Sequence, residues 1–185
     1  MAVFGGRGEP DVTMRLLWAE DGGGPARPAP GPRQSLTVAA ILEAAIGLAD
    51  EEGVSGLSMR AVGERLGRSA MALYTYVPGK AELLDLMYDQ AHADFSRACE
   101  EAADWRSGVV AWAVELRDLY LRHPWVLQVS HARPVLGPHE QAVLEALAGL
   151  LLATGLPGRV LRGAVSALFH HVRGSARTAA EAARG

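Results

Sequence analysis

The chain has 185 residues, enough for one domain of ordinary size or two small ones that share a core. Hydrophobic residues make up 49% and charged residues 21%, a globular balance, and the scarcity of aromatic residues (6%) beside abundant Ala and Leu favours helices over sheets. The net charge of −3 excludes a polycation that coats nucleic acid without specificity, but it leaves room for a local basic face.

Residues 1–34 are predicted to form a flexible extension. Residues 22–25 (Gly-Gly-Gly-Pro) and 28–32 (Pro-Ala-Pro-Gly-Pro) sustain neither a helix nor a central strand. An apolar island at residues 14–18 interrupts the extension. Two interpretations of it stay open: it docks on the folded body, or it is a weakly ordered stretch.

The first long helix is expected to begin near Ser35 and to end before Gly53. Either Ser35 or Thr37 can cap its start, and the glycine is a natural stop. Apolar residues recur along one helical face: Val38, Ile41, Leu42, Ala45, Ile46 and Ala49.

Two short helices are predicted next, at about residues 58–66 and 69–76. A serine opens each of them as a suitable N-cap, and Gly67 lies between them where a helix end takes a left-handed residue. Leu73 anchors the second helix in the core, and residues 78–79 (Pro-Gly) end it. Two short helices joined by a tight turn constitute a helix-turn-helix, in which the second helix presents its first residues to base edges in the major groove.

The rest of the chain is also predicted to be helical. One helix begins near Lys80 and carries an apolar stripe that extends to Phe95, and others span about residues 105–122, 138–154 and 159 to the end. Because no segment alternates with period two, we expect an all-α fold.

The stretch from Leu57 to Leu84 resembles the signature of the TetR (tetracycline repressor-like) family of transcriptional regulators. It combines a serine-led helix, a Leu-Gly turn, a Leu-Tyr pair and a lysine that opens the following helix. The resemblance implies a three-helix DNA-binding head at residues 35–82 and a helical effector-binding and dimerisation domain at residues 83–185.

The resemblance also implies DNA-contacting positions. They are Ser58, Arg60, Ser69, Ala70, Met71, Ala72, Tyr74, Thr75, Tyr76 and Lys80. In this interpretation Arg60 reaches a guanine edge or the backbone, the hydroxyl groups bind phosphates, and Lys80 holds a phosphate. The alternatives are that Met71 fills space, that Tyr74 packs in part, and that Arg60 is merely solvated.

The head is not basic overall. Between Ser35 and Leu84, four basic residues face six acidic ones, a net charge of −2. The affinity for DNA must therefore depend on where the charges point. Arg27 and Arg33 of the extension are candidate phosphate or minor-groove contacts, as in other proteins with flexible arms.

The second half more loosely resembles the C-terminal domain of the tetracycline repressor's own branch. In that branch a small molecule binds between helices, moves the helix that follows the head and changes the spacing of the two heads. The candidate ligand contacts are His92, Trp112, Leu116, His131 and Phe169, and the alternative for each is an ordinary core or surface residue. No metal or other cofactor is expected, because His170 and His171 are adjacent and project differently from a helix.

The chain is therefore expected to be a cytoplasmic, ligand-responsive repressor, a homodimer on palindromic double-stranded DNA with no membrane partner. It lacks a signal peptide pattern and an apolar run of spanning length. It stops about ten residues after Ser175, earlier than members of this branch usually do. This observation leaves open a second interpretation, in which the chain is a truncated family member that forms heterodimers and modulates a full-length relative. A helical carrier or enzyme is disfavoured, because no Ser-His-Asp arrangement, zinc spacing or phosphate loop is present.

Overall fold

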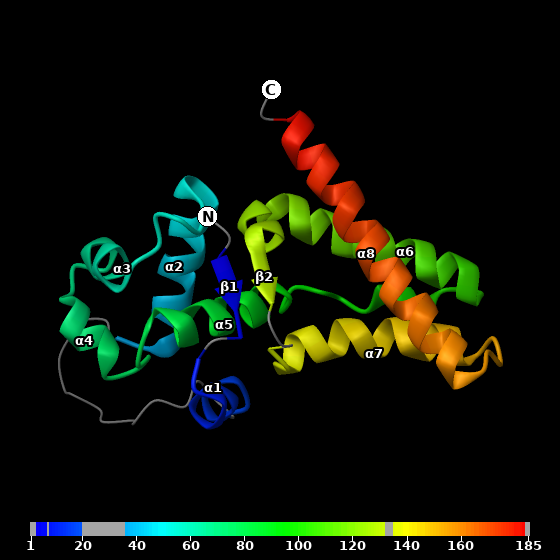
Figure 1. Ribbon diagram of the computed structural model, residues 1–185, viewed down its shortest axis with the longest axis horizontal. Helices are drawn as coiled ribbons and strands as arrows, with labels where there is room; N and C mark the ends of the chain where they lie inside the picture. Colours follow the sequence, from blue (N-terminus) through cyan, green and yellow to red (C-terminus); the bar gives the residue numbers. More distant parts are fainter. Residues whose placement is uncertain (1–2, 7, 20–35, 132–134, 184–185) are drawn as a thin grey trace. The chain divides into compact units, whose positions relative to one another are not determined.

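A computed structural model of the chain describes residues 3–6, 8–19, 36–131 and 135–183, and these divide into two compact units (Figure 1). The first unit comprises residues up to Gln90 together with residues 128–137, and the second comprises residues 91–127 and the chain from Pro138 onward. The prediction of an all-α fold is confirmed, apart from one short ladder of two strands.

The first unit contains the predicted helix-turn-helix. Its elements are β1 (Val3–Gly5), α1 (Pro10–Leu17), α2 (Val38–Glu52), α3 (Met59–Arg65), α4 (Ala70–Tyr74), α5 (Lys80–Ala91, the last residue of which belongs to the second unit) and β2 (Val129–His131). Of the two caps expected for α2, Thr37 is the one described, and its hydroxyl accepts a hydrogen bond from the Ala40 N–H at 3.1 Å. Gly53 ends this helix with a φ of 77°, a conformation that favours glycine.

The core of the first unit lies between α2, α3, α4 and α5. Ile41, Val62, Leu73, Leu83 and Met87 are each completely buried in it. Leu83 and Met87 lie four positions apart on α5, the spacing of one apolar helical face.

The second unit is a helical body. It contains the 3-10 turn η1 (Ala98–Glu101), α6 (Trp105–Arg122), the 3-10 turn η2 (Pro124–Gln128), α7 (Pro138–Leu152) and α8 (Gly158–Ala182). Helices α6, α7 and α8 pack against one another (Figure 1). Within the described residues, no helix has the length and apolar character needed to cross a membrane.

The structure differs from the predicted elements in three places. Within the extension that was predicted to be flexible, residues 3–5 form β1 and residues 10–17 form α1. The stripe that was expected to extend to Phe95 ends earlier, because α5 stops at Ala91 and the chain turns before Phe95, which is buried outside the helix. The predicted boundary at residue 82 falls inside α5, most of which packs with the head.

Candidate nucleic-acid interface and effector hollow

Helices α3 and α4 each begin at a serine cap. The Ser58 hydroxyl accepts a hydrogen bond from the Ala61 N–H at 3.1 Å, and the Ser69 hydroxyl accepts one from the Ala72 N–H at 3.3 Å. Between the helices, Gly67 adopts a φ of 63°. The predicted capping and turn chemistry of the helix-turn-helix is therefore confirmed.

Gly63 is a positioning residue that the sequence analysis missed. A β-carbon at this position would lie 2.7 Å from the Arg68 carbonyl oxygen and 3.2 Å from the Ala70 nitrogen, both of them backbone atoms. The Arg68 N–H also donates a hydrogen bond to the Gly63 carbonyl at 2.8 Å. The absence of a side chain lets the turn approach α3 this closely, and a glycine inside a helix of seven residues is the signal that could have revealed it.

The residues of α4 that were predicted to contact DNA differ in solvent exposure. Met71 is 75% exposed and Tyr74 is 44% exposed, whereas Leu73 is fully buried as predicted. Thr75 is exposed at the end of the helix, and Ala70, Ala72 and Tyr76 are half-buried. The helix thus presents a large apolar side chain, a phenol ring and a hydroxyl group on its accessible side.

Two of the arginines in the head are held by carboxylates. The Arg60 Nε lies 2.8 Å from Glu64 Oε1 with both side chains exposed, and this hydrogen bond raises the pKa of Arg60. The Arg65 guanidinium binds both carboxylate oxygens of Glu51, at 2.7 and 2.6 Å, and lowers the pKa of that carboxyl. Glu51, near the end of α2, thus fixes an arginine of α3.

Lys80 has a structural contact. Its Nζ donates a hydrogen bond to the Leu57 carbonyl oxygen, so the first residue of α5 is tied to the residue before the Ser58 cap. Lys80 as a whole residue is exposed at the start of the helix. The contact of Lys80 with a phosphate stays a prediction.

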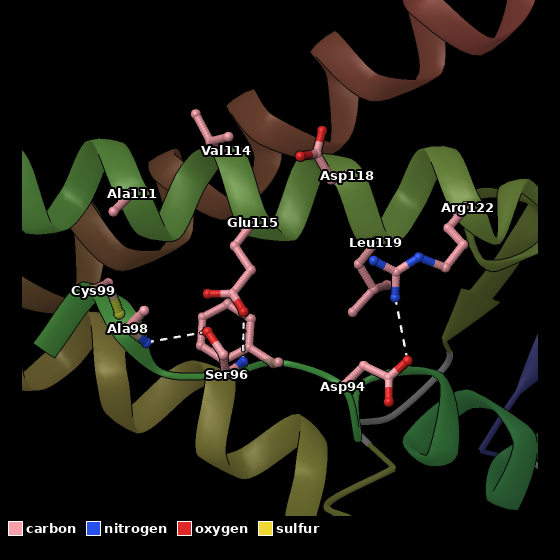
Figure 2. Close-up of a pocket in the computed structure, with 11 residues that line it drawn as sticks. Asp94, Ser96, Ala98, Cys99, Ala111, Val114, Glu115, Asp118, Leu119 and Arg122 are labelled. Atoms are coloured by element: carbon pink, nitrogen blue, oxygen red, sulfur yellow. Dashed lines mark hydrogen bonds and ion pairs between the residues drawn. The ribbon is translucent and has the colours of Figure 1, made fainter.

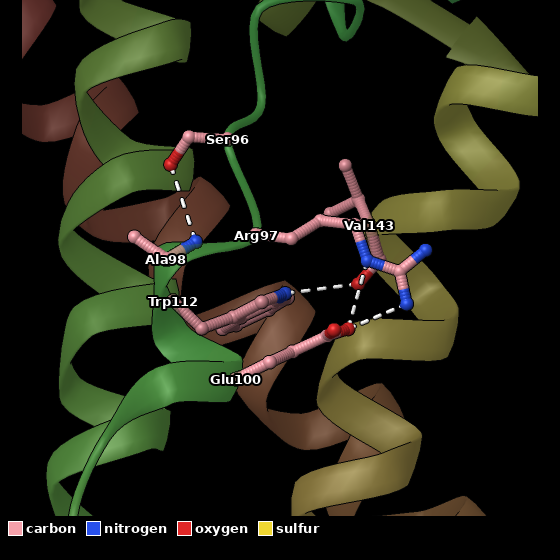
Figure 3. Close-up of polar contacts among 6 residues, drawn as sticks. All are labelled: Ser96, Arg97, Ala98, Glu100, Trp112 and Val143. Atoms are coloured by element: carbon pink, nitrogen blue, oxygen red, sulfur yellow. Dashed lines mark hydrogen bonds and ion pairs between the residues drawn. The ribbon is translucent and has the colours of Figure 1, made fainter.

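The predicted ligand contacts of the second unit lie mostly in its core. The Trp112 Nε1 donates a hydrogen bond to the Val143 carbonyl oxygen at 3.0 Å (Figure 3), and its ring meets Phe169 edge-on with the ring centres 4.9 Å apart. Leu116 is fully buried, and His92 is buried with its ring edge-on to Tyr120. This packing agrees with the alternative interpretation, in which these residues are ordinary core residues. Their role in binding a ligand stays a prediction.

His131 belongs to β2 in the first unit, and its side chain lies outside the described part of the structure. Arg27 and Arg33 also lie outside the described residues. Their proposed contacts are therefore not addressed by the structure.

A hollow of about 440 Å³ opens between α6 and the segment of residues 94–99 (Figure 2). Its lining combines three carboxylates and one arginine with apolar side chains, and an ion pair joins Arg122 to Asp94 at 3.2 Å. The lining residues are Asp94, Phe95, Ser96, Ala98, Cys99, Ala111, Val114, Glu115, Asp118, Leu119 and Arg122. None of the five predicted ligand residues lines this hollow, and the two of them on α6, Trp112 and Leu116, are fully buried.

The described residues contain no group of three or more His, Cys, Asp or Glu side chains that is able to hold a metal ion. Cys99 is buried, and burial raises the pKa of its thiol. The negative charge of Glu100 raises this pKa further, by a smaller amount. Such a thiol is a poor nucleophile.

Comparisons with known proteins agree with this geometry. The family described as "Bacterial regulatory proteins, tetR family" matches residues 41–87, and "Tetracyclin repressor-like, C-terminal domain" matches residues 99–184. The chain is 43% identical over 178 residues to the HTH-type transcriptional repressor DrrR1 of Streptomyces coeruleorubidus, covering 94% of this chain and 63% of that one. It is 35% identical over 140 residues to an HTH-type transcriptional regulator of Saccharopolyspora erythraea, covering 76% and 59%.

Solved structures give the same result. The structure of ActR from Streptomyces coelicolor in complex with actinorhodin superposes with a TM-score of 0.72 at 28% identity, covering 80% of this chain and 70% of that one. The transcriptional regulator SCO7222, a TetR from the same organism, superposes with a TM-score of 0.64 at 32% identity, covering 79% and 71%. The chain spans about 60% of the length of the curated relatives it matches. The family is one of regulators rather than enzymes, and the chain belongs to the tetR family of bacterial regulatory proteins.

Proposed function

We propose that this chain is a transcriptional repressor in which α3 and α4 bind the major groove of an operator. The observation that carries the proposal is the α3–turn–α4 pair, which is held by two serine caps and by the close approach at Gly63 and which leaves Met71 and Tyr74 exposed on the second helix. The similarity to the transcriptional repressor DrrR1 and to the transcriptional regulator SCO7222 supports it.

The DNA contacts follow from the exposed groups of the head. Arg60 reaches a base edge or a phosphate once it leaves Glu64, and the hydroxyl groups of Ser58 and Ser69 each keep a donor for a phosphate while they accept their capping bonds. The half-buried Ala70 and Ala72 offer only methyl contacts. Sequence-dependent DNA shape therefore contributes to the choice of operator.

The small size of the DNA-reading helix calls for a homodimer that binds a palindromic operator. A single α4 has five residues and reads only a few base pairs, so two heads about one turn of DNA apart are needed for tight binding. A cytoplasmic location, where the DNA lies, follows from this proposal.

A small molecule bound by the second unit releases the protein from its operator. ActR, which superposes on this chain, was solved in complex with actinorhodin. The hollow beneath α6 has a volume within the range of sites for small molecules, and the cluster at Trp112 and Phe169 is the alternative position. Thermodynamic linkage makes this effect reciprocal. Operator DNA must weaken binding of the small molecule by the same factor by which the small molecule weakens binding of DNA.

Fluorescence anisotropy on DNA from upstream of the gene, at two salt concentrations and with the mass in solution measured alongside, tests the proposal. Arg60→Ala is expected to weaken specific binding by roughly tenfold or more, or to reduce the salt slope by about 1 if the contact is to a phosphate. Arg177→Ala is the matched control, because Arg177 forms a similarly exposed ion pair with Glu181 one helical turn away on α8. Equal effects of the two substitutions would exclude Arg60 as a DNA contact, and the lack of a sequence preference at both salt concentrations would exclude specific reading of DNA by α3 and α4.

A further inference from the structure

The N-terminal residues form a docked arm that nothing in the helix-turn-helix requires. The arm comprises the described residues 3–6 and 8–19. Its strand β1 pairs in parallel with β2, in the register Val3 with Val129 and Gly5 with His131. Thr13 and Leu17, one turn apart on α1, are buried.

The arm binds buried carboxylates on α5. The Gly6 N–H donates a hydrogen bond to Asp85 Oδ1 at 2.6 Å, and the Glu9 N–H donates one to Glu82 Oε1 at 3.0 Å. Asp85 is 2% exposed and lies one turn after Glu82. Backbone N–H groups thus compensate carboxylates that would otherwise lose their hydration on burial.

The arm also binds the segment of residues 128–137. Besides the β1–β2 pairing, the Trp18 Nε1 donates a hydrogen bond to the Leu136 carbonyl oxygen at 3.0 Å. Gly137 of this segment lies directly against α5, where a β-carbon would collide with the Asp89 carboxylate. The arm, α5 and residues 128–137 therefore form one cluster within the first unit.

The cluster includes the parts of the chain at which the first unit continues into the second. The chain passes between the two units after Gln90, at the end of α5, and again at each end of residues 128–137. The arm is thus hydrogen-bonded to both parts of the first unit from which the chain continues into the second unit. A change in the second unit that moves either part must act against these bonds.

The docking is incomplete. Among the residues that the structure describes, the buried Thr13 hydroxyl has no hydrogen-bond partner, and it lines a hollow of about 100 Å³ between the arm, Asp85 and Leu136. A buried hydroxyl without a partner costs free energy, and a hollow forfeits packing contacts. Both effects lower the energy required to release the arm.

We propose that the arm is a releasable strap that holds α5 to residues 128–137 and so restrains the helix that follows the DNA-reading pair. The importance of this restraint for repression rests on the function proposed above. The existence of the restraint is independent of that function, because it is measured without DNA or effector.

Hydrogen exchange by mass spectrometry, comparing the whole chain with a variant lacking residues 1–19, tests the strap. Amides of α5 and β2 are expected to exchange about ten times faster or more without the arm, because each charge-assisted hydrogen bond contributes roughly that factor. The amides of α7 and α8 are expected to keep their rates. A synthetic peptide of residues 1–19 should restore the protection in a saturable manner.

Point variants separate the strap from a general loss of stability. Asp85→Ala is expected to reproduce the faster exchange of β2, and Asp85→Asn to restore most of the protection, because the amide oxygen still accepts from the Gly6 N–H. Asp11→Ala, at an exposed carboxylate on the arm itself, is the control and should change nothing. Unchanged exchange in α5 after deletion, or faster exchange spread over α7 and α8 as well, would overturn the proposal. Either result is independent of whether the chain binds an operator.

Discussion

Gly63→Ala tests whether the close approach of the turn to α3 sets the geometry of the DNA-reading pair. The added methyl group would lie 2.7 Å from the Arg68 carbonyl oxygen, a backbone atom that moves only if the turn moves. Overpacking of this kind costs about 1–3 kcal/mol. The gain in helix propensity from glycine to alanine offsets up to about 1 kcal/mol of that cost. The expected net loss is therefore about 1–2 kcal/mol.

For a chain of this length, that loss corresponds to a decrease in melting temperature of roughly 2–8 °C, measured by circular dichroism. The control is Gly149→Ala on α7, where a β-carbon would meet nothing within 4 Å, and this substitution should raise the melting temperature slightly. Because α4 must shift with the turn, operator affinity should fall by roughly tenfold for Gly63→Ala and remain unchanged for Gly149→Ala. If Gly63→Ala melted at or above the temperature of the unsubstituted chain, the steric reasoning would be refuted.

Three further outcomes are expected. Glu64→Gln removes the carboxylate that holds Arg60 and should tighten operator binding roughly two- to tenfold at low salt. This gain in affinity should shrink as salt is added. Equal affinity of the variant and the unsubstituted chain would show that Arg60 does not reach the DNA. Burial raises the pKa of the Tyr120 phenol, so the unfolded chain loses this proton first above about pH 10. The free energy of unfolding should then fall with pH less steeply in Tyr120→Phe, and identical slopes would contradict this. Trp112→Phe loses the hydrogen bond to a carbonyl on α7 and should cost about 1–3 kcal/mol in urea unfolding, more than Trp105→Phe at a half-buried indole.

The helices and their ends were predictable because the information for them is local. The helix predicted at residues 105–122 has those bounds, and the serines at 58 and 69 cap the helices that they were expected to cap. Each of these features depends on residues three or four positions apart, which periodicity and cap chemistry capture.

The docked arm was not predictable because its stabilising contacts come from distant parts of the sequence. Glycine and proline around the apolar island indicate a mobile chain, and the partners that order part of it are Asp85, Glu82 and Leu136. Strand β1 has only three residues, too few for an alternating pattern to be recognised. Of the two interpretations left open for the apolar island, docking is the one that the structure supports.

The candidate site was predictable only in part, for the same reason. The positions of α4 follow from the motif, but the pairing of Arg65 with Glu51 joins two helices and could not be read from either alone. The hollow beneath α6 depends on where the chain runs after α5 ends at Ala91. Its carboxylates therefore were not among the candidates drawn from apolar and histidine positions.

The charge arrangement of the head bears on how DNA affinity is achieved. If all four cations of the described head contacted phosphates, a dimer would neutralise about eight phosphates and the salt slope would be about −7. Arg60 and Arg65 are held by Glu64 and Glu51, so each must exchange a carboxylate for a phosphate, and if neither did so the slope would be about −4. A weaker electrostatic term leaves more of the affinity to base contacts, DNA shape and the joining of two heads in one molecule. On this reasoning the monomer binds DNA poorly even at low salt, so the geometry that holds two heads at the correct spacing, and any effector that changes it, controls occupancy of the operator.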